Sequence, residues 1–279
     1  MGQYFASDGT AIAFEEEGEG RPLVLLHGLM ANAGFFESQR ALAGDFRLIR
    51  IDLRGHGDSR GARGMLPGVE TLGDDVARLI ERLDIEDAIG IGWSLGAAVL
   101  WHVLTGPASH RFAGAVVVDM TPRVMNDADW QLGLSPAHCE ARARAIDEDF
   151  GGFARSAGAA IFAQQPGETA HPLTDWAAGQ FARSDPAAVG ALWASLVAAD
   201  FRPLLAAIRQ PTLVVHGVHS HLYGSDTADH LVAAMPDARS VAFAGSGHSP
   251  HLEQPDLFNR TLRDFAASLP PVAASQSIS

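Results

Sequence analysis

The sequence predicts an α/β protein in which a mostly parallel sheet carries helices on both faces. Six short apolar runs of strand length are separated by segments whose apolar residues recur at helical spacing. The runs are continuous rather than alternating, which is typical of strands covered on both faces. Strands that alternate with helices along the chain favour a parallel sheet. Hydrophobic residues make up 47% of the 279, enough for one large core.

The expected strands begin with a hairpin whose arms are Tyr4–Ala6 and Thr10–Glu16, with Asp8-Gly9 as the turn. The six apolar runs follow in chain order: Pro22–His27, Phe46–Ile51, Ala88–Trp93, Ala113–Val118, Thr212–His216 and Ser240–Phe243. Helical spacing between them is clearest at 76–83 and 257–265. In a sheet of this kind, the loops after the carboxyl ends of the strands form the functional site.

One region interrupts the alternation of strands and helices. Residues 121–205 contain no convincing strand, are rich in Ala and are divided by four prolines, Pro136, Pro166, Pro172 and Pro186. We therefore expect a core in two parts, 1–120 and 206–269, with a helical lid over 121–205. The position of this insertion between strand ends favours a lid over a purely stabilising subdomain. Residues 270–279 are small and polar, which predicts a disordered tail.

Charge and composition narrow the choice of partners. The 20 Lys and Arg residues against 33 Asp and Glu residues give a formal charge of −13, which would repel nucleic acid and slow anionic substrates. No apolar run approaches the roughly 20 residues of a membrane helix, and no secretory signal is visible. The single cysteine, Cys139, fits a reducing compartment. We expect a cytoplasmic protein that acts on a small molecule, without nucleic acid or membrane partners.

The strongest functional signal is Gly92-Trp93-Ser94-Leu95-Gly96, which matches the G-x-S-x-G pattern. The pattern alone is weak. Here it follows an apolar run and opens the helical stretch Gly96–Leu104, which is the strand–turn–helix setting that exposes a nucleophilic serine. We therefore predict Ser94 as the nucleophile.

A histidine near the C-terminus is the predicted general base. His248 lies in a glycine-rich loop after the last expected strand, where the base falls in the chain order Ser, acid, His. His251 is the local alternative. Four further histidines cluster nearby at 216, 219, 221 and 230, but their spacing matches no strong metal pattern. We expect neither a metal nor a cofactor.

Two backbone amides are the predicted oxyanion hole. His27-Gly28-Leu29 ends an expected strand at the place where one donor belongs, and Leu95 directly follows the nucleophile. Two fixed N–H groups aimed at a developing alkoxide can each contribute about 3–4 kcal/mol. The side chain of His27 is expected to brace the loop and to transfer no proton.

Four motifs in this order resemble the α/β-hydrolase superfamily, and most closely its lid-bearing carboxylesterase-like branch: His27-Gly28, Asp52–Ser59, Gly92–Gly96 and Gly247-His248. The resemblance spans about residues 3–268 and is more specific for the fold than for the substrate. It implies a structural role for the Asp52–Ser59 loop. In the Gly92–Gly96 motif, which this superfamily folds into a nucleophile elbow, the central residue is a serine. This argues against the dehalogenase and epoxide hydrolase branches, which have Asp at that position.

The resemblance leaves the acid of the triad open. The family usually has it a few residues beyond the strand at 211–216, but Ser220 stands near that position and the next carboxylate, Asp226, is expected to cap a helix. The superfamily can also have its acid at the end of the strand after the elbow helix, where Asp119 follows three valines. A carboxylate there is costly without a buried partner, which an imidazole N–H would provide. We predict Asp119, with Asp226 as the alternative.

Together these residues predict a serine hydrolase that cleaves a small, largely apolar carboxylic ester through an acyl-enzyme on Ser94. Alternatives on the same triad are a lactonase, a carbon–carbon-bond hydrolase and a cofactor-free haloperoxidase. A non-catalytic binding protein of this fold would need the pocket without the whole triad. The expected partner is a small ester or lactone.

Overall fold

The computed structural model describes residues 2–59, 66–164 and 169–271. In these residues one eight-stranded sheet has the order β1-β2-β4-β3-β5-β6-β7-β8. The strands are β1 (Gly2–Phe5), β2 (Ala11–Glu17), β3 (Arg21–Leu26), β4 (Phe46–Ile51), β5 (Ala88–Trp93), β6 (Phe112–Val118), β7 (Thr212–Gly217) and β8 (Ala238–Phe243). β1 and β2 pair antiparallel with their neighbours, and the remaining pairs are parallel. The predicted fold class is confirmed.

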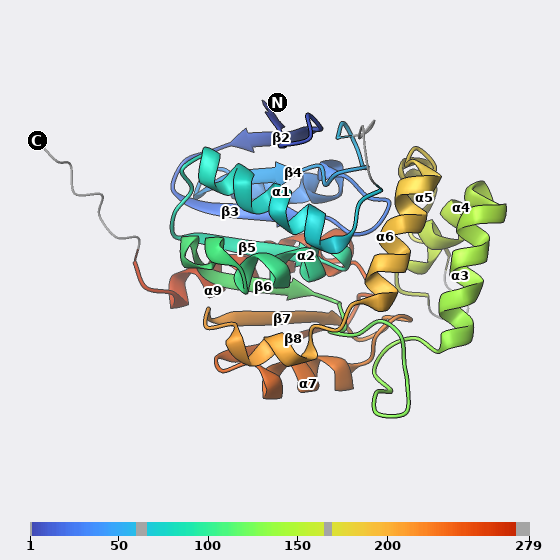
Figure 1. Ribbon diagram of the computed structural model, residues 1–279. Helices are drawn as coiled ribbons and strands as arrows, with labels where there is room; N and C mark the ends of the chain where they lie inside the picture. The colour runs from blue at the N-terminus through green and yellow to red at the C-terminus, as the bar shows by residue number, and fades with distance from the viewer. Residues whose placement is uncertain (1, 60–65, 165–168, 272–279) are drawn as a thin grey trace, which may run out of the picture.

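Helices cover both faces of this sheet. They are α1 (Val69–Arg82), α2 (Leu95–Leu104), α7 (Ser225–Ala234), α8 (Pro250–Glu253) and α9 (Pro255–Ser268), with 3-10 turns η1 (Ala33–Leu42), η2 (Pro107–Arg111) and η3 (Arg202–Ala207). In Figure 1, α1 and α2 lie in front of the sheet. On the other side η1 and α9 pack together, and Gln39 Nε2 donates to Asn259 Oδ1 over 3.2 Å. Helical spacing of apolar residues explains the buried faces of α1 and α9.

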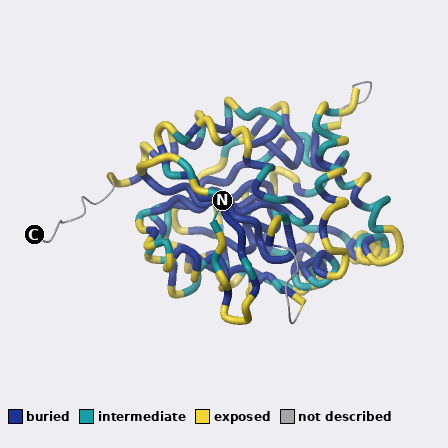
Figure 2. The backbone as a smooth tube through the Cα atoms, turned by 90° about the horizontal axis from the view of Figure 1, so that it is seen from above, coloured by how far each residue is buried: buried dark blue, intermediate teal, exposed yellow. Residues whose placement is uncertain are grey.

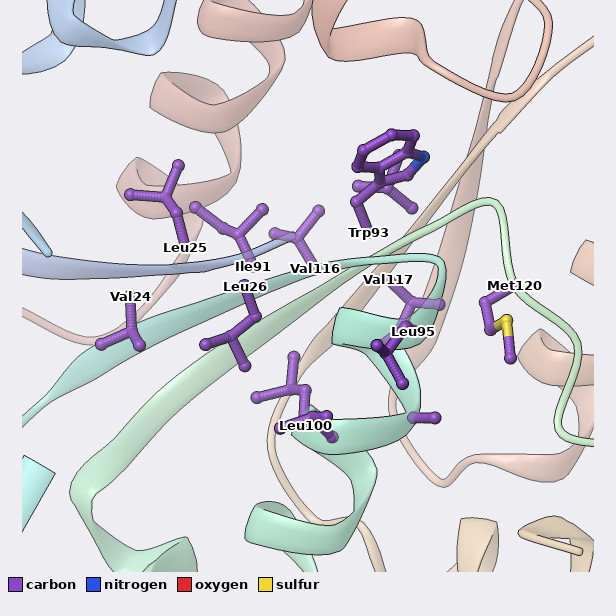
Figure 3. Packing of buried hydrophobic residues seen from close by; sticks show 14 of the residues in the cluster. Val24, Leu25, Leu26, Ile91, Trp93, Leu95, Leu100, Val116, Val117 and Met120 are labelled. Atoms are coloured by element: carbon purple, nitrogen blue, oxygen red, sulfur yellow. The ribbon is translucent and has the colours of Figure 1, made fainter. Parts of the chain in front are cut away.

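The inner strands are apolar throughout because both faces are covered. Leu25, Ile91 and Val116 lie on one side of β3, β5 and β6, whereas Val24 and Leu26 lie on the other, facing α2 (Figure 3). Figure 2 shows the same strands as a buried interior beneath a partly exposed shell. This two-sided burial is the physical reason for the continuous apolar runs in the sequence.

The described part of residues 121–205, the predicted insertion, contains four α-helices: α3 (Pro136–Glu148), α4 (Phe150–Ala160), α5 (Thr174–Phe181) and α6 (Pro186–Ala198). They gather beside the end of the sheet at which β6 ends (Figure 1). Two of the prolines expected to divide this region begin helices, because a first-turn proline lacks only an N–H that would be unpaired anyway. The side chains of Ser135 and Asp185 cap those two helices.

Some expectations fall on other parts of the chain. Pro166 and all of the predicted disordered tail except Pro270 and Pro271 lie outside the described residues. Among the described residues, no helix is long and apolar enough to span a membrane.

Candidate active site

Ser94 occupies a strained turn between β5 and α2. Its backbone has φ 54° and ψ −119°, a left-handed conformation that is costly for a residue with a Cβ. The glycines two residues to either side make the turn possible: a Cβ on Gly92 would collide with the backbone of Gly96 and Ala97, and one on Gly96 would collide with the carbonyl of Leu26. The turn therefore presents Ser94 at the carboxyl end of a central strand.

Asp119 and His248 form a buried pair beside this turn. Asp119 directly follows β6, the strand next to β5, and its Oδ2 lies 2.6 Å from Nδ1 of His248. Both side chains are almost fully buried. The backbone of Asp119 is also left-handed, with φ 46°, and its N–H donates to the carbonyl of Val215 over 2.8 Å. The structure thus brings together two of the predicted triad residues that lie 129 positions apart.

Ser220 is a further contact of the acid that the sequence did not reveal. Its hydroxyl donates to Asp119 Oδ2 over 2.7 Å, so one carboxylate oxygen accepts from both Ser220 and His248. Oδ1 of Asp119 is buried and has no partner within the described chain. The sequence placed Ser220 near the position after β7 where the family usually has its acid. That placement suggested a role beside the histidine, but it did not indicate which carboxylate the serine would contact.

Asp226 lies elsewhere. It is exposed in the first turn of α7 and forms no hydrogen bond with His248 in the described chain. The expectation that Asp226 caps this helix is wrong, because Gly224 occupies the N-cap position with an extended backbone. Asp226 is instead placed where a negative charge interacts favourably with the helix dipole.

Trp93 connects the turn at Ser94 to His248, the predicted base. Its indole N–H donates to the carbonyl of His248 over 2.8 Å, and the two rings are 5.6 Å apart. Ser94 and His248 line the same cavity, without a hydrogen bond between them in this structure. Such contacts often tighten only when substrate binds.

The two predicted oxyanion donors both belong to segments next to Ser94. Leu29 follows Gly28, where an added Cβ would be 3.3 Å from Cβ of Ser94, so this loop packs directly against the nucleophile. Leu95 is the first residue of α2, and a first-turn N–H has no partner within its helix. Neither amide donates a hydrogen bond to another described residue.

The other histidines near the site are held as neutral, structural groups. His27 Nε2 accepts from Leu53 N over 3.0 Å, and the opposite ring nitrogen contacts the carbonyl of Gly28 over 2.8 Å. Burial lowers the pKa of His27 to about 4. His251 is fully buried against Trp93 and Phe36, and burial lowers its pKa to about 3. His251, the local alternative as base, does not line the cavity.

The Asp52–Ser59 loop is fixed by its own first residue. Asp52 accepts hydrogen bonds from the backbone amides of Ala33 and Asp58, each over 2.7 Å. Burial raises the pKa of this carboxyl. Such contacts fit a structural role beside the site.

A cavity of about 60 Å³ opens at Ser94 and His248. The core contributes Gly28, Leu29, Met30 and Trp93; Leu222 comes from the loop after β7; the insertion contributes Arg142, Phe153, Ala157, Ala160, Ile161 and Phe181. The lining is mostly apolar, with one guanidinium that the sequence did not single out. No group of three or more His, Cys, Asp or Glu side chains that could hold a metal ion occurs within the described ranges.

A strained serine turn, a buried His–Asp pair and a shared apolar cavity on a mostly parallel sheet define a hydrolase of the α/β class. The model of the alpha/beta hydrolase family matches residues 23–261, and the chain belongs to this family. The predicted family is confirmed, and with it the expectation of an esterase-like hydrolase.

Known proteins resemble the chain over most of its length. A pimeloyl-[acyl-carrier protein] methyl ester esterase from Nitrosospira multiformis is 33% identical, over 92% of this chain and 98% of that protein. An esterase from Rhodococcus sp. ECU1013 has a TM-score of 0.82 at 27% identity, covering 96% and 98% of the two chains. An esterase from Exiguobacterium antarcticum has a TM-score of 0.89 at 24% identity, covering 95% and 99%.

Proposed function

We propose that the chain hydrolyses carboxylic esters through an acyl-enzyme on Ser94, with His248 as general base and Asp119 as the acid that orients it. The observation that carries this proposal is the 2.6 Å contact between Asp119 and His248 beside the cavity that Ser94 shares. Since Nδ1 of His248 faces the carboxylate, Nε2 is the nitrogen free to take the serine proton.

The reaction follows from these positions. Ser94 Oγ attacks the ester carbonyl and transfers its proton to His248 Nε2, while the amides of Leu29 and Leu95 bind the negative oxygen. The imidazolium, stabilised by Asp119, then protonates the departing alcohol. A water molecule, deprotonated by the same nitrogen, attacks the acyl-enzyme, and collapse of the second tetrahedral intermediate releases the acid and restores Ser94.

The substrate we propose is a small, largely apolar ester. The mostly apolar lining of the cavity and its volume of about 60 Å³ support this choice. Several relatives are named as methyl ester esterases, which favours a small alcohol as leaving group. A lactone is the second candidate, supported by a solved N-acyl homoserine lactone degrading enzyme with a TM-score of 0.80 at 25% identity. We also infer a cytoplasmic location, in keeping with one free, buried cysteine.

The insertion, residues 121–205, is proposed to act as the lid of this site. Its support is that α3, α4 and α5 contribute side chains to the cavity, namely Arg142, Phe153 and Phe181 among others. Residues that line a pocket from a separate helical layer can alter substrate preference without changing the sheet that holds the triad.

A fluorophosphonate probe tests the nucleophile. We expect labelling at Ser94, hydrolysis of p-nitrophenyl esters and lactones in a chain-length screen, and loss of both labelling and hydrolysis in Ser94→Ala. Circular dichroism should show that this variant stays folded. Hydrolysis at a near wild-type kcat by purified Ser94→Ala would refute the mechanism.

A further inference from the structure

Arg142 is a cation in an otherwise apolar part of the substrate cavity. It lies half-buried on α3 and lines the same cavity as Ser94 and His248. Within the described chain its guanidinium forms no ion pair with a carboxylate. A cation that is partly removed from water and has no counter-ion is unfavourable, so an anion entering the cavity would gain a partner already in place.

The position of this guanidinium is fixed by neighbouring helices. Its Cζ lies 5.5 Å from the ring centre of Trp193, which comes from α6. The indole N–H of Trp193 in turn donates to the carbonyl of Cys139 over 3.1 Å, one turn before Arg142 on α3. Cation–π contact and this hydrogen bond hold the arginine without consuming its own donors. A guanidinium held in this way loses little further entropy when it binds a ligand.

The positive charge of Arg142 also acts on Tyr223, a neighbour of His248. Tyr223 is buried, and its ring lies 6.2 Å from that of His248. Burial raises the pKa of the Tyr223 phenol, and the positive charge of Arg142 opposes that rise. Arg142 and His248 also line the same cavity.

We propose that Arg142 is an anion-binding subsite, and that the substrate carries a carboxylate separated from the scissile ester by a short apolar stretch. This inference rests on ester hydrolysis at Ser94. The planar guanidinium can bind a carboxylate through two parallel hydrogen bonds, which fixes the orientation of the substrate. Ligand pockets typically combine an apolar lining with a few polar groups that determine specificity.

The overall negative charge of the chain does not oppose this subsite at close range. Repulsion between exposed charges is screened over about 8 Å at physiological ionic strength. Arg142 instead is half-buried in the lining of the cavity, where the attraction between opposite charges is stronger than in bulk water. Long-range charge thus affects how fast an anionic ester approaches, whereas Arg142 affects how it is bound.

Matched pairs of esters test the proposal. Monomethyl esters of straight-chain dicarboxylic acids are compared with methyl esters of the monocarboxylic acids of equal chain length. A second arm places the carboxylate on the alcohol side, with acetate esters of ω-hydroxy acids against acetate esters of the matching alcohols. The quantity compared is the ratio of kcat/KM, charged over neutral, at each chain length.

We expect the wild-type ratio to reach about ten or more at one chain length in one arm. Arg142→Met should bring that ratio to about one or below, mainly by raising KM for the charged ester. The control is Arg144→Met, which removes the same charge from an exposed position on the same helix and should keep the wild-type ratio. If Arg142→Met does not fold, Arg142→Gln makes the same comparison.

Two results would overturn the subsite: a wild-type ratio of one or less at every length in both arms, or equal loss of preference in the Arg142 and Arg144 variants. In those cases neutral esters would still be hydrolysed and Ser94 would still react with fluorophosphonate. Failure of the proposed function looks different, because neither ester of any pair would be cleaved and Ser94 would not be labelled.

Discussion

Ser220 Oγ and His248 Nδ1 contact the same oxygen of Asp119, at 2.7 and 2.6 Å. The serine belongs to the loop after β7, and the aspartate follows β6. The acid could be expected after either β6 or β7. The residues at these two places, Asp119 and Ser220, contact each other at Oδ2 of Asp119. Asp119 supplies the charge, and Ser220 supplies a hydrogen bond that orients the charged group.

Replacing Asp119 should nearly abolish catalysis. Asp119→Asn keeps the shape of the side chain but favours the wrong tautomer of His248, and in a serine protease the corresponding change costs about 10⁴ in kcat. Asp226→Asn is the control, with little loss of activity and under about 1 kcal/mol of stability, because Asp226 is exposed in the first turn of α7. Steady-state kinetics on both variants decides. An inactive Asp226→Asn beside an active Asp119→Asn would show that the acid is misassigned.

Ser220 should be a positioning residue whose role can be exchanged with that of the acid. Ser220→Ala removes one donor from Asp119 and should lower kcat by about tenfold with KM little changed. Asp119→Asn combined with Ser220→Asp places a carboxylate within reach of the same point, and should recover at least about tenfold of the activity lost in Asp119→Asn. A folded double variant no more active than Asp119→Asn would rule out this exchange.

A larger side chain at Ala157 should shorten the acyl group that the site accepts. Ala157 lines the cavity from α4, so Ala157→Leu fills part of its volume of about 60 Å³. We expect kcat/KM to fall more for octanoate than for acetate p-nitrophenyl esters, by about tenfold in their ratio. Ser156→Leu adds a comparable side chain at the adjacent exposed position and should leave the ratio unchanged. Equal ratios in both variants would mean that α4 does not shape the acyl site.

Acid should destabilise the fold through three buried histidines. Burial lowers the pKa of His27 to about 4, of His56 to about 3 and of His251 to about 3, against 6.5 for an exposed imidazole. Between about pH 6.5 and 4 the unfolded chain therefore binds more protons than the folded one. The free energy of unfolding should fall with decreasing pH, by up to about 1.4 kcal/mol per pH unit for each histidine.

His251 offers the cleanest test of this pH dependence. Both of its ring nitrogens lack a partner within the described chain, and it packs against aromatic rings. His251→Phe should therefore keep stability at pH 7.5 within about 1.5 kcal/mol and remove about a third of the acid sensitivity. Urea unfolding from pH 7.5 to 5 measures both, with His221→Phe, at an exposed histidine, as the control. An unchanged slope in His251→Phe would exclude its contribution.

The strands were predictable because their apolar character is a local consequence of two-sided burial. Each expected run coincides with a strand to within two residues, from the hairpin to the run at Ser240–Phe243. The serine turn was equally predictable. Glycine is needed at positions 92 and 96 because a Cβ there would collide with the backbone, and both positions lie within one five-residue motif. These features depend on neighbours in the sequence.

Contacts between distant residues were less accessible. The hydrogen bond from Ser220 to Asp119 joins residues 101 positions apart and depends on the sheet bringing β6 beside β7. The position of Arg142 in the cavity could not be predicted from the sequence. The spacing of residues along α3 does not indicate which face of this helix lines the cavity. The capping error at Asp226 has a local cause: Gly224 adopts the extended backbone that begins the helix two residues earlier.

The hydrogen bond from Trp93 to the carbonyl of His248 spans 155 residues and connects the serine turn to the loop between β8 and α8. During synthesis, a nascent chain that has reached only α7 holds Ser94 and Asp119 but lacks His248, which is both the proposed base and the acceptor of the hydrogen bond from Trp93. By the proposed mechanism, ester cleavage can begin only after the segment that carries His248 has emerged and docked. The time at which Ser94 becomes reactive would therefore report when folding of the nascent chain is complete.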